Sequence, residues 1–179
     1  PAFRNKEHFY IPKGGTGFGV RLLYQFFKNK FVDWFYIMTE KKEKLKVGIT
    51  HGDVNGIGYE VILKTFTDAA MLDLCTPIIY GSKKYSSKHK AQLKMDNFPF
   101  FLIEKSEDAQ INKVNLIDCC DDEDELKIGE PTMSSGKAAF QALNAATDDL
   151  LNGKIDSIIT APINKKNIQG EQFNFPGHT

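Results

Sequence analysis

From Met38 onward, short apolar runs alternate with longer segments in which apolar residues recur at helical spacing. The runs that predict strands are 45–50, 76–82, 98–104, 114–119 and 154–163. The segment 59–72 predicts a helix, because four apolar residues stand close to helical spacing in it. These residues are Val61, Leu63, Phe66 and Ala70.

The clearest helical pattern lies in residues 134–153. Its apolar stripe consists of Ala139, Leu143, Ala146 and Leu150. Ser134 or Ser135 is expected to cap the first turn, and Gly153 stands where a helix ends. A second, more polar helix is expected over 83–95.

Strands that alternate with helices in this way indicate an α/β fold with a largely parallel sheet. Ligands of such sheets bind beyond the carboxyl ends of the strands. We therefore expect three loops to gather at that edge. They are the glycine-rich turn 52–58, the turn Thr160–Pro162 and the "PGHT" sequence at 176–179.

Residues 1–37 differ from the rest of the chain. They carry six basic residues against two acidic ones, a net charge of +4, whereas the whole chain is neutral. Charged residues interrupt their aromatic stretch, so no membrane span is expected there. The segment is a basic amphipathic surface helix, the end of another domain, or a non-native extension. We favour the last, because Met38-Thr39-Glu40 is typical of a translation start, which makes 38–179 the native portion.

Charge and cysteine content narrow the remaining classes. A net charge of zero gives no indication of a nucleic-acid or membrane partner. Three cysteines without a C-x-x-C pair exclude a zinc ribbon or a thioredoxin-type site. Such a low, odd count fits a reducing cytosol, so we expect a cytoplasmic protein.

The turn "HGDVNGIGYE" resembles a phosphate-binding loop but matches neither standard template. Its glycines, Gly52, Gly56 and Gly58, are spaced G-x-x-x-G-x-G, whereas a dinucleotide fingerprint needs G-x-G-x-x-G. A Walker loop would need a lysine followed by serine or threonine. From the residues alone, the turn is either structural or a ligand loop, in which Asp53 and Asn55 cap the next helix or contact the ligand.

Two other positions are open to more than one interpretation. Lys137, near the start of the long helix, either holds a phosphate together with the helix N-terminus or is an exposed lysine. His178 follows a Pro-Gly turn, and by itself it indicates an exposed loop histidine, because a catalytic metal usually takes three protein ligands. The acidic run 121–125 is expected to be a solvated turn.

Three separated blocks, "THGDVNGIGYEV", "ITAPINKKNI" and "FPGHT", resemble the 4-hydroxythreonine-4-phosphate dehydrogenase family, PdxA. The resemblance covers about Lys44 to Thr179 and the N-terminal part of the family's length. It implies a three-layer α/β/α fold similar to isocitrate and isopropylmalate dehydrogenases, here truncated.

The resemblance also implies an activity and a site. The family oxidises 4-phosphooxy-L-threonine with NAD and a divalent metal (Zn, Mg or Co), and the product loses carbon dioxide to give 3-amino-2-oxopropyl phosphate on the pyridoxal 5'-phosphate pathway. Its homodimer shares metal ligands between subunits. By motif, His178 is a metal ligand, and Lys165 matches a family lysine near the active-site floor. Lys137 stands where the family often has a substrate-binding histidine, so both lysines are candidate substrate-binding residues. The first loop departs from the family at His51, Val54 and Tyr59, where prolines are common.

Three function hypotheses follow. The leading one is an NAD-dependent, metal-requiring dehydrogenase of vitamin B6 synthesis. The runner-up is a sister dehydrogenase that acts on a phosphorylated sugar acid of the threonate phosphate type. The third is a binding fragment that is inactive by itself, since the resemblance implies two further metal-binding histidines beyond Thr179. In the dehydrogenase hypothesis Gly52, Gly56 and Gly58 shape the floor of the cleft between domains, and His178 marks the place of the metal.

Overall fold

The computed structural model describes residues 44–122 and 124–168. The chain divides into two compact units, Pro1–Glu43 and Lys44–Thr179, and the described residues belong to the second. The predictions for residues 1–37, for Met38 and for the "PGHT" sequence therefore lie outside the described residues.

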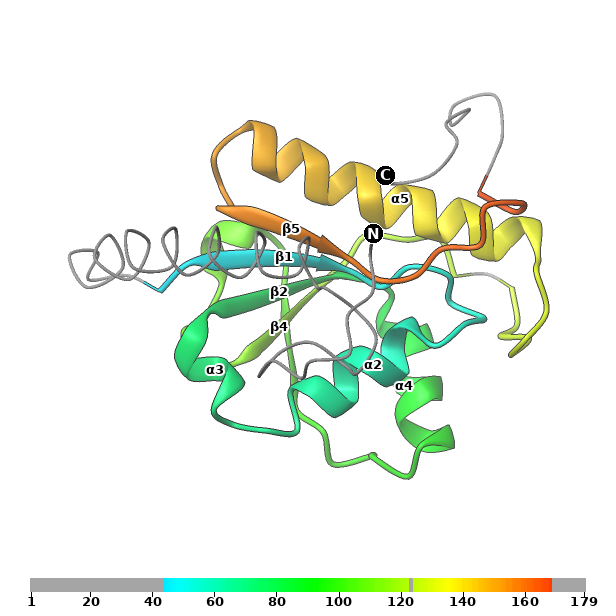
Figure 1. The fold of residues 1–179 in the computed structure, drawn as a ribbon, viewed down its shortest axis with the longest axis horizontal. Helices are drawn as coiled ribbons and strands as arrows, with labels where there is room; N and C mark the ends of the chain where they lie inside the picture. Colours follow the sequence, from blue (N-terminus) through cyan, green and yellow to red (C-terminus); the bar gives the residue numbers. More distant parts are fainter. Residues whose placement is uncertain (1–43, 123, 169–179) are drawn as a thin grey trace, which may run out of the picture. The chain divides into compact units, whose positions relative to one another are not determined.

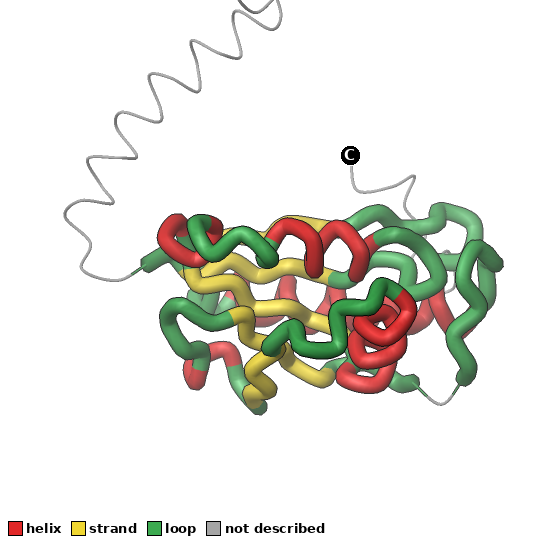
Figure 2. The backbone as a smooth tube through the Cα atoms, turned by 90° about the horizontal axis from the view of Figure 1, so that it is seen from below, coloured by secondary structure: helices red, strands yellow, loops and turns green. Residues whose placement is uncertain are grey.

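The described residues form a five-stranded parallel sheet with helices on both faces (Figures 1 and 2). The strand order is β3-β4-β2-β1-β5. The strands are β1 (Lys46–Thr50), β2 (Thr76–Gly81), β3 (Phe100–Ile103), β4 (Val114–Asp118) and β5 (Ser157–Thr160). The helices are α2 (Gly58–Thr65), α3 (Met71–Leu74), α4 (Lys83–Gln92), the 3₁₀ turn η1 (Ser106–Asp108) and α5 (Met133–Leu151). The predicted α/β class and parallel sheet are confirmed.

The central strands β1, β2 and β4 are buried on both faces, which is why they are apolar at most positions. On one face Ile79 and Leu116 pack with Ile62 and Leu63 of α2. Helix α5 covers the opposite face (Figure 1). There Ile78, Tyr80 and Ile117 pack with Ala142 and Ala146, so alternate strand residues pack against opposite layers. The expected three-layer α/β/α arrangement is therefore present.

The predicted helix over 59–72 is wrong in its extent. Helix α2 ends at Thr65, and a separate short helix α3 follows. Thr67 donates its hydroxyl to Leu63 O at 2.9 Å, and Asp68 accepts the Ala70 N–H at 3.0 Å. These local bonds compete with helix continuation. The buried face contains Ile62 and Leu63, whereas Val61 is 47% exposed.

The predicted cap of α5 is also wrong by a few residues. The N-cap is Thr132, whose hydroxyl accepts the Ser135 N–H at 3.1 Å, while Ser135 completes the capping box from inside the helix. Because the helix begins at Met133, Ser134 lies within its first turn. Gly153 has φ of +69° just beyond the C-cap Asn152, as its position predicted.

Small residues let α5 lie close to the sheet. Its fully buried face is mostly alanine: Ala138, Ala139, Ala142 and Ala146. On the facing strand, a Cβ on Gly48 would lie 2.6 Å from Ile155 Cδ1 and 3.1 Å from Tyr80 Cε2. A side chain at position 48 would therefore displace the Ile155 and Tyr80 side chains, which lie in the same buried cluster as Ala142 and Ala146 of α5.

None of the helices in the described part of the chain has the length and apolarity that a membrane crossing requires. This holds even for α5, which is 19 residues long.

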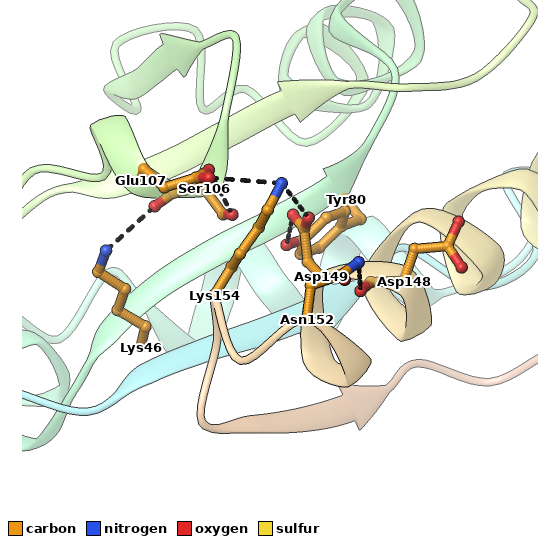
Figure 3. A network of polar contacts seen from close by, with 8 residues as sticks. All are labelled: Lys46, Tyr80, Ser106, Glu107, Asp148, Asp149, Asn152 and Lys154. Atoms are coloured by element: carbon orange, nitrogen blue, oxygen red, sulfur yellow. Dashed lines mark hydrogen bonds and ion pairs between the residues drawn. The ribbon is translucent and has the colours of Figure 1, made fainter.

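A polar network ties η1 and the end of α5 to β2 (Figure 3). The Tyr80 hydroxyl donates to Asp149 Oδ2 at 2.7 Å. Lys154 Nζ lies 3.3 Å from Asp149 Oδ1 and 3.4 Å from Glu107 Oε1. Despite partial burial, which acts in the other direction, the bonds from Tyr80, Ser106 and Lys154 lower the pKa of Asp149. The network thus contains an ionised carboxylate with a buried hydroxyl donor.

Tyr80→Phe should lower the free energy of unfolding by about 1.5 kcal/mol, because a charge-assisted hydrogen bond is lost at a buried position. Urea denaturation at neutral pH measures this. Tyr85→Phe is the matched control. Within the described residues, the Tyr85 hydroxyl donates to an uncharged acceptor, the main-chain carbonyl of Asp124, at 3.3 Å. Equal losses in both variants would show that the Asp149 bond has no special weight.

Candidate functional site

Two of the three loops expected at the carboxyl edge of the sheet meet there. The Asp53 N–H donates to Pro162 O at 2.9 Å, and the Ala161 N–H donates to Thr50 O at 3.2 Å. Gly52 has φ of +70°, and a Cβ on it would lie 2.3 Å from Pro162 O. A glycine is therefore required at position 52 both by conformation and by space. The chains leaving β1 and β5 are therefore in direct main-chain contact, as expected for loops at the carboxyl edge of a parallel sheet.

Asp53 joins this edge of the sheet to the start of α5. Its Oδ1 accepts the Asn55 N–H at 3.0 Å, and its Oδ2 accepts from Asn167 Nδ2 at 3.3 Å. Asn167 Nδ2 also donates to Ser135 Oγ at 2.8 Å. Asp53, Asn167 and Ser135 are all buried. Three segments distant in sequence are thereby held in fixed relation, and we name Asp53, Ser135 and Asn167 the polar triangle.

Asn55 holds a different segment, the approach to α5. Its Nδ2 donates to Glu130 O at 2.9 Å and to Thr132 Oγ1 at 3.1 Å, and its Oδ1 accepts the Lys127 N–H at 2.9 Å. With these bonds made, the Asn55 side chain serves the loop rather than a ligand. Neither Asp53 nor Asn55 caps α2, because its N-cap is Ile57 and no side chain bonds there.

Two glycines allow backbone segments to touch at this edge. A Cβ on Gly136 would lie 1.7 Å from Asn167 O, and a Cβ on Gly58 would lie 1.9 Å from His51 O. Both distances are far shorter than any real contact, so each glycine marks a point where main chains pack directly. Gly136 therefore fixes how closely the segment after β5 approaches α5.

The predicted substrate lysines lie in exposed positions. Lys137 is in the first turn of α5, and its Nζ lies 2.6 Å from Asp121 Oδ2. The bond from Lys137, with that from Gln141, lowers the pKa of Asp121. Lys165 is exposed in the turn that leads to Asn167. Lys137 and Lys165 lie on different segments, and their substrate role stays a prediction. The role of His178, which lies outside the described residues, also stays a prediction.

A buried aromatic stack lies behind the glycine-rich turn. The His51 and Tyr59 rings stack at 5.4 Å and 4°, and the Tyr59 ring lies 5.1 Å from His89. The Tyr59 hydroxyl donates to Ser82 O at 3.0 Å and accepts the Ser82 N–H at 2.8 Å. A Cβ on Gly81 would lie 2.4 Å from the Tyr59 hydroxyl, so β2 ends in glycine to admit this ring.

His51 is fully buried and makes one side-chain contact that defines its tautomer. Its Nε2 lies 3.3 Å from Cys120 Sγ, and Cys120 donates its S–H to Ala138 O at 3.3 Å. The sulfur therefore accepts from Nε2–H, and Nδ1 stays an acceptor with no hydrogen-bond partner within residues 44–168 as described. Burial lowers the pKa of His51 to about 4, so the ring is neutral.

Sequence reasoning missed this stack. In the sequence, His51 and Tyr59 stood only as departures from the family pattern. The available signal was a histidine that directly follows an apolar strand. That signal is weak, because spacing does not reveal that His89, from another helix, completes the stack.

The metal prediction has no counterpart in the described residues. Within 44–122 and 124–168, no three histidine, cysteine, aspartate or glutamate side chains are grouped so that they could hold a metal ion. The predicted ligand, His178, belongs to residues outside that part. The metal site therefore stays a prediction.

Comparison with known families decides the affiliation. The model of the family described as pyridoxal phosphate biosynthetic protein PdxA matches residues 73–179, more than half of the chain. The chain belongs to the PdxA family. Its family membership had been predicted from three short blocks, and this prediction is confirmed.

Relatives in the PdxA family match over most of the chain. A 4-hydroxythreonine-4-phosphate dehydrogenase from Bacteroides thetaiotaomicron is 48% identical over 139 residues, which is 78% of this chain and 38% of that protein. A Clostridium botulinum protein with the provisional name D-threonate 4-phosphate dehydrogenase is 33% identical over 136 residues, 74% of this chain and 40% of its own length. The chain thus spans about two fifths of these relatives.

Solved PdxA-family structures share the fold. A 4-hydroxythreonine-4-phosphate dehydrogenase from Burkholderia phymatum superimposes with a TM-score of 0.69 at 30% identity, over 77% of this chain and 42% of that one. The enzyme of the same name from Klebsiella pneumoniae gives a TM-score of 0.67 at 27% identity, over 78% and 42%.

Gly136→Ala should lower the free energy of unfolding by about 2 kcal/mol, because the new methyl group overlaps Asn167 O and forces the two segments apart. Urea denaturation gives the loss, and amide exchange at Asn167 and Ile168 should become faster. Lys137→Ala, at the next and exposed position, should change stability by less than about 1 kcal/mol. Stabilisation by Gly136→Ala, as helix propensity alone would give, would contradict the close packing.

Stability should fall as the pH drops from about 6.5 to about 4. The folded His51 has a pKa of about 4 and stays neutral, whereas the unfolded residue takes up a proton near 6.5, so acid favours unfolding by up to about 3 kcal/mol. His89, whose pKa burial also lowers, acts in the same direction. The free energy of unfolding, measured by urea denaturation across this range, should depend less steeply on pH in His51→Gln than in the unchanged protein. Parallel slopes for both proteins would rule out His51 as the titrating group.

Proposed function

We propose that this chain is part of an NAD-dependent dehydrogenase that oxidises 4-phosphooxy-L-threonine, with loss of carbon dioxide, to 3-amino-2-oxopropyl phosphate. The observation that supports it is the 48% identity to the Bacteroides enzyme named for this substrate. Relatives with the provisional threonate name are 33–35% identical over a similar span. A D-threonate 4-phosphate dehydrogenase is therefore the second candidate. The two candidate substrates share the phosphate and differ in the group at the carbon that bears the amine in 4-phosphooxy-L-threonine.

The described residues would supply the rigid edge on which this chemistry takes place. The polar triangle and the Asp53–Pro162 hydrogen bond hold the carboxyl ends of β1 and β5 together with α5. Lys165 lies between the anchored residues Pro162 and Asn167, so its exposed ammonium group would meet an anionic substrate from a fixed base. Lys137 would have to exchange its Asp121 carboxylate for a substrate phosphate.

The cofactors and the assembly belong to the proposal as well. His178 would be one ligand of a divalent ion, Zn, Mg or Co, and when bound the ion would act as a Lewis acid at the substrate hydroxyl. NAD would accept the hydride. The lack of a G-x-G-x-x-G sequence does not oppose NAD, because the family resembled here does not use that fingerprint. A homodimer with a shared site and a cytoplasmic location complete the proposal.

A hybrid enzyme tests the proposal directly. Residues Lys44–Thr179 replace the corresponding stretch of the Bacteroides relative, and NADH formation is measured by absorbance. We expect kcat/KM for 4-phosphooxy-L-threonine to exceed that for D-threonate 4-phosphate by about tenfold or more, the effect of one satisfied polar contact at the amine. The 179-residue chain alone should give no NADH, since it carries a single histidine of the implied metal set.

Two controls make the result interpretable. The same hybrid with His178→Ala should keep its thermal melting profile and lose activity and metal content, as measured by elemental analysis. A reversed substrate preference would favour the threonate candidate. A folded, metal-loaded hybrid that reduces NAD with neither substrate would sink the proposal, and turnover by the 179-residue chain alone would refute the need for the remaining length.

A further inference from the structure

Two adjacent cysteines stand at the carboxyl end of β4. The Cys119 N–H donates to Gly81 O at 2.9 Å, which continues the pairing of β4 with β2 by one residue. Beyond that bond the strand ends, and both side chains lie on the same side, with their sulfur atoms 3.8 Å apart. Both thiols are free and half-buried. They are therefore in contact with one another and within reach of small solutes.

We propose that Cys119 and Cys120 form a thiol modification site, which a low-molecular-weight disulfide such as oxidised glutathione converts reversibly into a Cys119–Cys120 disulfide. This site is separate from the proposed dehydrogenase function and does not depend on it. Closing the bond requires the sulfurs to approach from contact distance to about 2 Å.

The proposed disulfide is of the easily reduced kind. Neighbouring Cα atoms are about 3.8 Å apart across a trans peptide, whereas disulfides usually join Cα atoms about 4.4 to 6.8 Å apart. The bond would therefore be strained, and strained disulfides have the higher reduction potentials typical of labile, regulatory bridges. The two thiols are unbridged in the structure, so the bond would have to form within the folded chain.

The reaction has a defined order. Hydrogen bonding with Cys119, together with burial, raises the pKa of the Cys120 thiol, so Cys120 stays protonated and Cys119 reacts first. The Cys119 thiolate attacks one sulfur of oxidised glutathione, forms a mixed disulfide and releases one glutathione. Cys120 then attacks Cys119 Sγ, its proton passing to the second departing glutathione. Overall, two thiols and one disulfide give one disulfide and two thiols, and two electrons pass to glutathione.

Oxidation would change the contacts that Cys120 makes with two other parts of the chain. The Cys120 S–H donates to Ala138 O in α5, and Cys120 Sγ accepts from His51 in the loop after β1. A disulfide has no S–H, so Ala138 O would lose its side-chain donor, and movement of Sγ toward Cys119 would lengthen the contact to His51. The state of the thiol pair is thus communicated to the start of α5 and to the glycine-rich turn.

Intact-mass analysis of the 179-residue chain tests the site. The chain is incubated with excess oxidised glutathione, quenched with acid and alkylated. We expect a product lighter by two hydrogen atoms, with a single alkylated cysteine, Cys75, and full reversal by dithiothreitol. Cys75→Ser is the matched control, because Cys75 is also half-buried but has no thiol neighbour in the described residues. This variant should form the same bridge.

The alternative outcomes overturn the proposal. A glutathione adduct that persists on Cys119 would show that Cys120 cannot close the bond, and an unchanged mass would show that the pair is inert. In Cys120→Ser, by contrast, the persistent adduct is expected. Hydrogen exchange of the wild-type chain supplies the second readout: amides in the first two turns of α5 should exchange about fivefold faster after oxidation, the effect of one lost hydrogen bond. Equal amide exchange rates in the reduced and the oxidised chain would contradict the proposed effect of the thiol pair on α5.

Discussion

Asn167 places its main-chain oxygen where any side chain at position 136 would have to stand, and its amide group bonds Asp53 and Ser135 at once. The first feature demands glycine on α5, and the second demands polar partners on two further segments. Since all of these atoms are buried, the loss of one member would leave others unsatisfied, which is costly. The geometry of the carboxyl edge thus depends on one asparagine.

The α/β class and the parallel sheet were predictable because they depend on periodicity, whereas the three-layer arrangement was implied by the family resemblance. Apolar runs of strand length, separated by helical patterns, can bury both of their faces only in a parallel sheet that helices cover on both sides. What failed were element ends. The hydroxyl of Thr67 and the carboxylate of Asp68 terminate α2 through bonds that are local yet invisible to an apolar pattern. Likewise Thr132, rather than Ser134 or Ser135, caps α5, because the helix begins where Asn55 holds the preceding loop.

The candidate site was predictable only in part. The predicted parallel sheet indicated that the turn after β1 would meet the turn after β5, and they do. The sequence could not show that Asn55 and Asp53 would bond to the protein's own groups, since this depends on partners up to 114 residues away. It equally could not show that His51, Tyr59 and His89 would stack behind the turn, because the three residues come from separate elements.

The bond between Asp53 and Asn167 spans 114 residues, and this separation has a consequence for the order of folding. Closing so long a loop is entropically costly, so contacts of this kind form after the local helices and the neighbouring strand pairs. During synthesis, β1 and β2 can pair early, whereas the glycine-rich turn waits for the last described segment to leave the ribosome. Until then the turn lacks its partner Asn167. The carboxyl edge of the sheet is therefore the part of this unit that would be accessible to chaperones and proteases.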